Sequence, residues 1–324
     1  MYTSYFKEKG SKENVLSIAF YNTDNMFDVF DDPDTLDDDF TPTGDKKWTL
    51  RRYKNKIEKI GEVISTIGLK HAKLPPIFVG LAELENQTVL LDLVESKKLA
   101  PFNYDYVHYD SPDERGIDVG FIYQKAYFEL LDSKIYPLML FDERGKRDYT
   151  RDMLLVKGKL HGVLVYIIIN HWPSRRAGTE LTESKRIAAA NRVHEIINEV
   201  QKETRDANII IMGDFNDGPN DTSINNHLVT DDFYNPMQAM KDKGKGSLVY
   251  KNKWILFDQI IMSKTFFNDS VIKLKYKYAD IFNPKYIRTW KGKNKNNPHR
   301  TYIGRWHQGG VSDHFPVFVY FEKL

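Results

Sequence analysis

The chain carries acidic, amide and imidazole residues beside several short apolar runs. The stretch "IIIMGDFND" places Asp214 and Asn216 directly after four apolar residues. Similar residues border four other runs, at Asn22 and Asp24, Glu83, Asn170 and His171, and Asp313 and His314, and Asp258 lies inside a fifth. A single Asp after a strand is most often a turn or helix-capping residue. Because burial draws the apolar runs into one core, six such positions together favour a single site for cation binding or proton transfer.

The sequence contains no cysteine, which excludes disulfides and thiolate metal sites. A bound metal must therefore be held by carboxylate, amide or imidazole groups. These ligands favour a hard divalent cation such as Mg²⁺, Mn²⁺ or Ca²⁺.

Short apolar runs alternate with longer amphipathic segments, which is typical of an α/β protein. Helices are predicted at about 48–67 and 180–199. Strands are predicted at 16–22, 76–83, 104–110, 117–123, 153–160, 163–170, 208–214, 255–263 and 315–322. No linker rich in Pro, Gly or Ser divides the chain, so we expect one domain over residues 1–324, with residues 1–14 flexible.

Two segments have a strong charge bias although the net charge is only +2. Residues 28–45 contain eight Asp and no Lys or Arg, and we interpret them as a solvated loop because they lack EF-hand spacing. Residues 281–312, called the basic segment below, contain seven Lys or Arg and no acid. Trp290, Tyr302 and Trp306 alternate with these cations, as in grooves that bind single-stranded nucleic acid; a plain surface loop is the equal alternative.

No run of 18 apolar residues is present, so no transmembrane segment is predicted. The first 14 residues lack the apolar region of a secretory signal. As the sequence stands we expect a cytoplasmic protein, or a secreted or periplasmic one if a leader has been removed. No protein partner can be inferred.

Seven sequence blocks resemble, in order, those of the endonuclease/exonuclease/phosphatase superfamily, which has a deoxyribonuclease-I-like fold. They span residues 16–321 and are "YNTDNMFD", "VGLAELEN", "RGIDVGFIY", "NHWPSR", "GDFND", "FDQIIMS" and "SDHFPV". The resemblance implies a four-layer sandwich, with two β-sheets packed face to face, helices on the outer faces and an active site at one rim. It also implies divalent-metal-dependent hydrolysis of a phosphoester.

The resemblance further implies a ligand set for the metal, most readily Mg²⁺. Glu83 would be the central ligand, helped by Asp313 and by Asn22 or Asp24.

Proton transfer and charge stabilisation would fall to other residues. Asp214 would orient or deprotonate the attacking water, and Asn216 would hold a phosphate oxygen or that water. His314 has an expected orienting partner in Asp258, and His171 would contact the scissile phosphate or assist the leaving group. Whether Asp214 or His314 is the general base stays open at this point.

Four further residues are expected to contact substrate. Arg115 would bind phosphate with Asp118 as its positioner, although a purely structural ion pair between them is equally compatible. Asn170 and Arg175 flank His171 and are the other phosphate-contact candidates.

The expected function is a nuclease acting on DNA or RNA, because the basic segment leads directly into Asp313. The alternatives are a phosphodiesterase or phosphatase for a small-molecule or lipid head-group phosphate, and a non-catalytic binding module on the same fold. A haloacid-dehalogenase-like phosphatase is disfavoured because no early apolar strand precedes an Asp-x-Asp pair. The inositol-phosphate phosphatase branch is disfavoured because its Cys-containing block is missing.

Overall fold

A computed structural model describes residues 14–176, 178–267 and 273–324 of the chain. The expected flexibility of residues 1–14 falls almost wholly on residues 1–13, which lie outside this part. No helix in the described ranges is long and apolar enough to cross a membrane.

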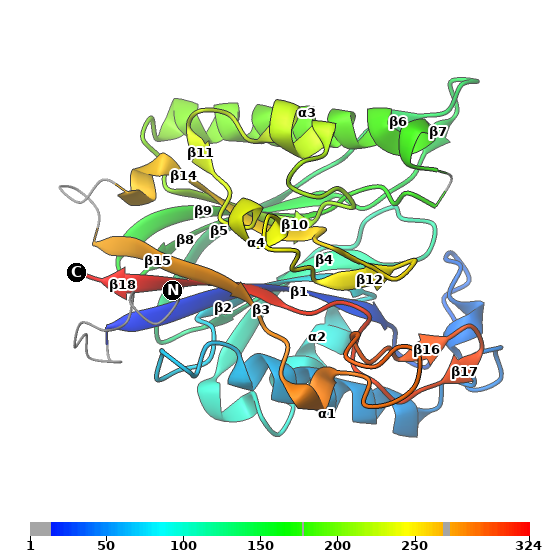
Figure 1. Cartoon of the computed structure of the whole chain (residues 1–324). Helices are drawn as coiled ribbons and strands as arrows, with labels where there is room; N and C mark the ends of the chain where they lie inside the picture. The colour runs from blue at the N-terminus through cyan, green and yellow to red at the C-terminus, as the bar shows by residue number, and fades with distance from the viewer. Residues whose placement is uncertain (1–13, 177, 268–272) are drawn as a thin grey trace.

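Two six-stranded mixed sheets form the centre of the molecule (Figure 1). The first sheet has, in spatial order, β15 (Leu274–Ile281), β18 (Val317–Lys323), β1 (Val15–Met26), β2 (Phe78–Leu84), β4 (Asp118–Gln124) and β3 (Tyr104–His108). The second has β11 (Phe233–Tyr234), β14 (Asp258–Ser263), β10 (Ile209–Asp214), β9 (Val163–His171), β8 (Met153–Leu160) and β5 (Phe128–Tyr136).

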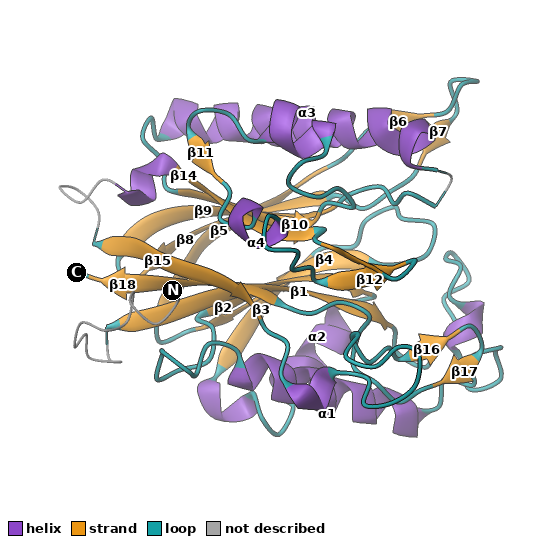
Figure 2. Cartoon of the chain, viewed as in Figure 1, coloured by secondary structure: helices purple, strands orange, loops and turns teal. Residues whose placement is uncertain are grey.

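Helices cover the outer faces of both sheets (Figure 2). α1 (Leu50–Thr66) and α2 (Gln87–Val94) lie against the first sheet, and α3 (Thr179–Glu203) lies against the second. The described part also contains a short helix, α4 (Gln238–Lys241), and three two-stranded hairpins: β6 (Leu140–Phe141) with β7 (Arg147–Asp148), β12 (Leu248–Tyr250) with β13 (Lys253–Ile255), and β16 (Tyr302–Ile303) with β17 (Trp306–His307). Short 3-10 helices lie at Asp38–Phe40, Ala100–Phe102, Lys264–Phe267 and Lys285–Ile287, and a π-helix lies at Ser223–Leu228. The four-layer sandwich is therefore confirmed.

The alternation of side chains along each strand explains how the layers pack. Ile167 and Ile169 of β9 lie in the core shared by the two sheets, whereas Ile168 packs with Val193 and its neighbours on α3. The sheets approach closely enough that a Cβ at Gly80 of β2 would lie 2.6 Å from the Met212 sulfur of β10. Tight packing thus fixes the strand ends of one sheet relative to those of the other.

Candidate active site

Strand direction brings the chemically competent residues to one rim of the sandwich. β1 and β2 are parallel, and Asn22 is level with Ala82 at their carboxyl ends. In the second sheet Asp214 pairs with His171 on one side and with Asp258 on the other. β18 runs antiparallel to β1, so the loop that holds Asp313 and His314 enters at the same rim. β14 begins at Asp258, which is therefore a strand end and not an interior position as the sequence suggested.

Irregular backbone turns the carboxylates of the first sheet toward this rim. Asp24, Asn25 and Glu83 all have φ between 56° and 60°, the left-handed region that non-glycine residues rarely adopt. The strand register shifts at the same places, between Asn22 and Met26 and between Ala82 and Leu84. Bulges of this kind re-aim a side chain, and such backbone strain collects at functional sites.

A hydrogen bond joins the two sheets at the rim. The Asn22 side-chain amide donates to Asp214 Oδ2 at 3.0 Å, and the backbone N–H of Asn216 donates to Asp214 Oδ1 at 3.0 Å. Burial raises the pKa of Asp214 to about 7; His314 opposes this shift and Asp258 adds to it. Asp214 is consequently a carboxyl group that exchanges its proton near neutral pH.

His314 is held as a cation by surrounding carboxylates. Its Nδ1 lies 2.7 Å from Asp258 Oδ2, which also accepts a hydrogen bond from the Ser247 hydroxyl at 2.5 Å. The expected pairing of these two residues is confirmed. Burial alone would lower the pKa of His314, but Asp258, Asp313 and Asp214 together raise it well above its ordinary value. The imidazolium is therefore the favoured form.

The pKa of His171 is shifted in the opposite direction to that of His314. Burial, followed by the nearby Arg151 and Arg115, holds the pKa of His171 well below its ordinary value. Its Nε2 lies 3.8 Å from Glu83 and 3.9 Å from Asp214, and its buried Nδ1 has no hydrogen-bond partner among the described residues. A neutral imidazole at this position can donate one hydrogen bond and accept another.

Three carboxylates face one another beside a buried ammonium group. Burial and then Asp313 raise the pKa of Asp24 to about 7; Glu83 contributes in the same direction and Lys56 opposes it. The Lys56 side chain is buried, donates to the backbone oxygen of Asp24, and bonds the Thr301 hydroxyl at 2.9 Å. The Arg300 guanidinium also lies 3.4 Å from Asp313, but the contributions of Asp313 and Glu83 to the pKa of Asp24 show that these carboxylates repel one another, and a bound cation would relieve this repulsion.

The donor set fits a hard divalent cation. Asp24, Glu83, Asp313 and Asn22 offer only oxygen ligands, and the side chains of Glu83 and Asp313 keep 15% and 26% of their surface exposed. Among the described residues, two groups bring three ligand atoms within 4.8 Å of one another: Asp214 with Asp258 and His314, and His108 with Asp110 and Asp118. The first is centred on a protonated imidazole, which has no lone pair to give a metal. Asp24, Glu83 and Asp313 do not form such a group, so they are a candidate cation site because of their oxygen ligands and negative charge, and not because of the closeness of those ligands.

The four expected substrate contacts are placed differently. Arg115 donates to the side chain of Asn25 and so reaches the rim. Its expected pairing with Asp118 is wrong, because Asp118 lies 3.1 Å from His108 Nε2 on the neighbouring strand and accepts hydrogen bonds from Ser111. Asp118 thus makes its side-chain contacts within the first sheet and the adjoining loop, and it does not position Arg115.

Asn170 and Arg175 lie near His171 but already have protein partners. The Asn170 amide group donates to the backbone oxygens of Ile168 and Met212, and its oxygen accepts from the Trp172 indole. Arg175 binds the backbone of Asn216 at 2.7 Å and the carboxylates of Asp217 and Asp221. The Arg175 contacts support the loop after β10, and neither the Asn170 nor the Arg175 side chain is free to bind substrate in this arrangement.

Several residues at the rim were not expected from the sequence. Arg151 is buried, bonds Asp113 at 2.9 Å and the backbone oxygen of Trp172 at 2.9 Å, and contributes to the lowered pKa of His171. Lys56 was also missed, although its position on the face of α1 that carries Ile57 and Ile60 was a usable signal. A lysine within an apolar stripe is seldom fully buried without partners.

Comparison with known proteins extends these observations. No curated protein matches the sequence. Among solved structures, TDP2 from D. rerio in complex with a single-strand DNA product has a TM-score of 0.58 at 14% identity, with 96% of this chain and 100% of that chain covered. A mannosyl-6-phosphatase from Bacteroides thetaiotaomicron has a TM-score of 0.57 at 15% identity, with 94% and 99% covered. At these identities the likeness shows the fold alone.

A match of the sequence to a family model is more specific. The model describes the Endonuclease/Exonuclease/phosphatase family and matches residues 17–323. This match supports a hydrolase that acts on phosphoester bonds, and the acidic residues at the rim suit the divalent-metal dependence that is general in the family. The chain therefore belongs to the Endonuclease/Exonuclease/phosphatase family.

Proposed function

We propose that the chain is a divalent-cation-dependent phosphodiesterase that cleaves DNA or RNA, acting as one catalytic domain. The observation that carries the proposal is the contact between the basic segment and the carboxylates. The backbone N–H of Thr301 donates to Asp24 Oδ2 at 3.1 Å, and the Arg300 guanidinium lies 3.4 Å from Asp313. A polyanion that follows the basic segment would be led to these carboxylates.

The surface of the basic segment also suits a single strand. Trp290 and Trp306 are 71% and 78% exposed, and the Lys291 ammonium lies 4.3 Å from the ring centroid of Trp290. Exposed rings beside cations bind bases by stacking and phosphates by charge. The single-strand DNA product bound to the structurally similar D. rerio TDP2 is consistent with this substrate class.

In the proposed mechanism Glu83, Asp313, Asp24 and Asn22 would hold the cation. When bound, a divalent cation supplies a Lewis acid that polarises a phosphoryl oxygen and neutralises developing charge. Lys56 fixes the backbone of Asp24 beneath this site. The Asp24 carboxylate itself accepts hydrogen bonds from the backbone N–H of Thr301 and from the Asn25 side-chain amide.

Asp214 is the proposed general base. Its pKa of about 7 matches proton removal from water near neutral pH, whereas His314 is held as a cation and cannot accept a proton. His314, 4.0 Å from Asp214, would instead stabilise charge on the phosphate. Neutral His171 would donate a hydrogen bond to a phosphate oxygen, and Asn216 would orient the attacking water.

A substrate panel with one variant tests this function. Wild type and the Arg288→Gln, Lys291→Gln, Lys293→Gln, Lys295→Gln quadruple variant are compared on single-stranded DNA, plasmid DNA, RNA, a chromogenic phosphodiester, a phosphomonoester and sphingomyelin, at several salt concentrations. We expect cleavage of nucleic acid, with a selective loss in the variant and a shallower salt dependence, by roughly 0.7 to 0.9 in slope per lost phosphate contact. Equal losses on polymer and small diester, or cleavage of the monoester or sphingomyelin alone, would contradict the nuclease assignment.

A further inference from the structure

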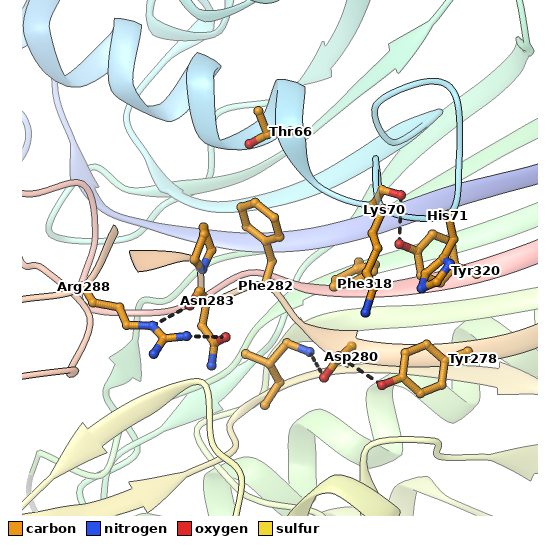
Figure 3. A pocket seen from close by; sticks show the side chains of 13 residues that line it. Thr66, Lys70, His71, Tyr278, Asp280, Phe282, Asn283, Arg288, Phe318 and Tyr320 are labelled. Atoms are coloured by element: carbon orange, nitrogen blue, oxygen red, sulfur yellow. Dashed lines mark hydrogen bonds between the residues drawn. The ribbon is translucent and has the colours of Figure 1, made fainter. Parts of the chain in front are cut away.

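A cavity of about 350 Å³ lies between the turn that follows α1 and the edge of the first sheet formed by β15 and β18 (Figure 3). This volume is in the range of small-molecule sites. None of the catalytic or metal-binding candidates lines the cavity. It is therefore separate from the carboxylate cluster, whose nearest member in the chain, Asp313, precedes β18.

Aromatic side chains form one wall of the cavity. Phe318 and Tyr320 alternate along β18, and the Phe282 ring packs against Phe318 with a centroid distance of 6.4 Å. The Tyr278 ring stacks on Tyr320 at 6.4 Å and 16°. Phe282 and Tyr278 are only half-buried, so ring surface is available to a planar ligand.

The charged groups around the cavity leave it positive. Arg288 and Lys70 approach it from different sides, as Figure 3 shows. In the described part of the chain no carboxylate lies within 4.0 Å of either side chain, and Arg288 is held by the backbone and side-chain oxygens of Asn283. The one acid in the wall, Asp280, is already paired with Lys245 at 2.9 Å and with the Tyr278 hydroxyl at 3.0 Å. Charge complementarity thus calls for an anionic ligand.

We propose that this cavity binds a nucleotide unit, with the base against Phe282 and the phosphate at Lys70 or Arg288. An aromatic ring joined to an anion matches both the wall and the cations. The cavity adjoins the basic segment through Arg288, and Phe318 follows His314 by four residues, which span at most about 13 Å of extended chain at about 3.3 Å per residue. The cavity would then hold a nucleotide that flanks the cleaved bond of a strand, and this part of the inference rests on the proposed nuclease function.

A free mononucleotide and a nucleotide within a single strand both present an aromatic base joined to a phosphate. Binding measurements distinguish these two ligands. Adenosine 5′-monophosphate, adenosine, inorganic phosphate and a labelled ten-nucleotide single strand are titrated into the protein with chelator present, so that no cleavage interferes. The proteins are wild type, Lys70→Gln, Phe282→Leu and the control Lys98→Gln, an exposed lysine outside the cavity. Circular dichroism melting verifies that each variant is folded.

Wild type should bind the monophosphate more tightly than adenosine or phosphate, and both cavity variants should lose about tenfold, the loss expected for one charge-assisted or stacking contact. A parallel loss on the ten-nucleotide strand supports a strand subsite, and a loss confined to the monophosphate supports a free-nucleotide site. Unchanged monophosphate affinity in both folded cavity variants, or an equal loss in Lys98→Gln, overturns the proposal. Absence of nucleic-acid cleavage by wild type would instead refute the nuclease function and leave the monophosphate result standing.

Discussion

Two histidines at the same rim have different protonation states because their neighbours differ: His314 is a cation and His171 is neutral. Burial lowers the pKa of both rings; Asp258, Asp313 and Asp214 outweigh this effect at His314, whereas Arg151 and Arg115 add to it at His171. Asp214 lies between the two rings, 3.9 Å from one and 4.0 Å from the other. We therefore expect the ionisation of Asp214 to control the reaction rate near neutral pH.

The pH dependence of the rate tests this assignment. Asp214 must lose its proton to act as a base, and its folded-state pKa is about 7, so kcat should rise with pH and level off above that value. Asp214→Asn should lower kcat by about 10²-fold or more and flatten the rise. A wild-type rate that falls as pH increases from 6 to 8, or an Asn variant that keeps the wild-type profile, would rule Asp214 out as the base.

Lys56 is a positioning residue, since its ammonium holds the backbone of Asp24 and the hydroxyl of Thr301. Lys56→Met should displace Asp24 and reduce kcat by about 10²-fold, the cost typical of an ångström of misplacement, with a smaller change in KM. Lys54→Met, on the exposed face of the same helix, is the matched control. If Lys56→Met melts like wild type and keeps its kcat, the residue has no role in positioning.

At the scale of elements, α3 supports the loop that follows β10. Arg186 of α3 is completely buried, and its guanidinium lies 2.7 Å from the buried carboxylate of Asp217, next to Asn216 in the chain. Asp217 also accepts hydrogen bonds from Arg175 and from Ser223. The helix, a residue after β9 and the loop are therefore joined through one carboxylate.

Breaking this connection should destabilise the whole protein. Arg186→Met removes a positive charge that neutralises the buried carboxylate of Asp217. We expect a loss of about 3 to 5 kcal/mol in the free energy of unfolding. Urea denaturation measures the loss, and Lys185→Met in the neighbouring, more exposed ion pair with Asp148 should change stability by about 0.5 kcal/mol or less. A loss in Arg186→Met no larger than that of the control would mean that the pair is not structural.

At the scale of the whole molecule, the strands and helices with strong hydrophobic patterns could be predicted from the sequence. Continuous apolar runs indicated β9 and β10, and the apolar stripe at Ile57, Ile60 and Ile64 indicated α1, whose observed bounds are Leu50–Thr66. The resemblance supplied the layer order, and strand direction then accounts for the shared rim. The pairing of His314 with Asp258 also followed, because both belong to recognisable blocks.

The other strands and side-chain pairs could not be predicted, because they depend on tertiary contacts between residues far apart in the sequence. β15 and β5 were missed because they are edge strands with exposed charged residues and no continuous apolar run. The partner of Asp118 was missed because His108 comes beside it only when β3 pairs with β4. Lys56 and Arg151 were missed for the same reason, since each meets its partners across 20 or more residues of sequence.

The central claim is that the oxygen ligands around Glu83 support cation-dependent hydrolysis of a phosphodiester. The most direct test measures kcat of wild type and Glu83→Gln on the best phosphodiester substrate, with added Mg²⁺ or Mn²⁺ and with excess chelator. We predict that chelator abolishes the wild-type activity, that the cation restores it, and that Glu83→Gln keeps the wild-type circular dichroism spectrum but loses activity by orders of magnitude at every cation concentration. Full wild-type turnover in excess chelator, or a folded Glu83→Gln variant with wild-type kcat, would contradict the claim.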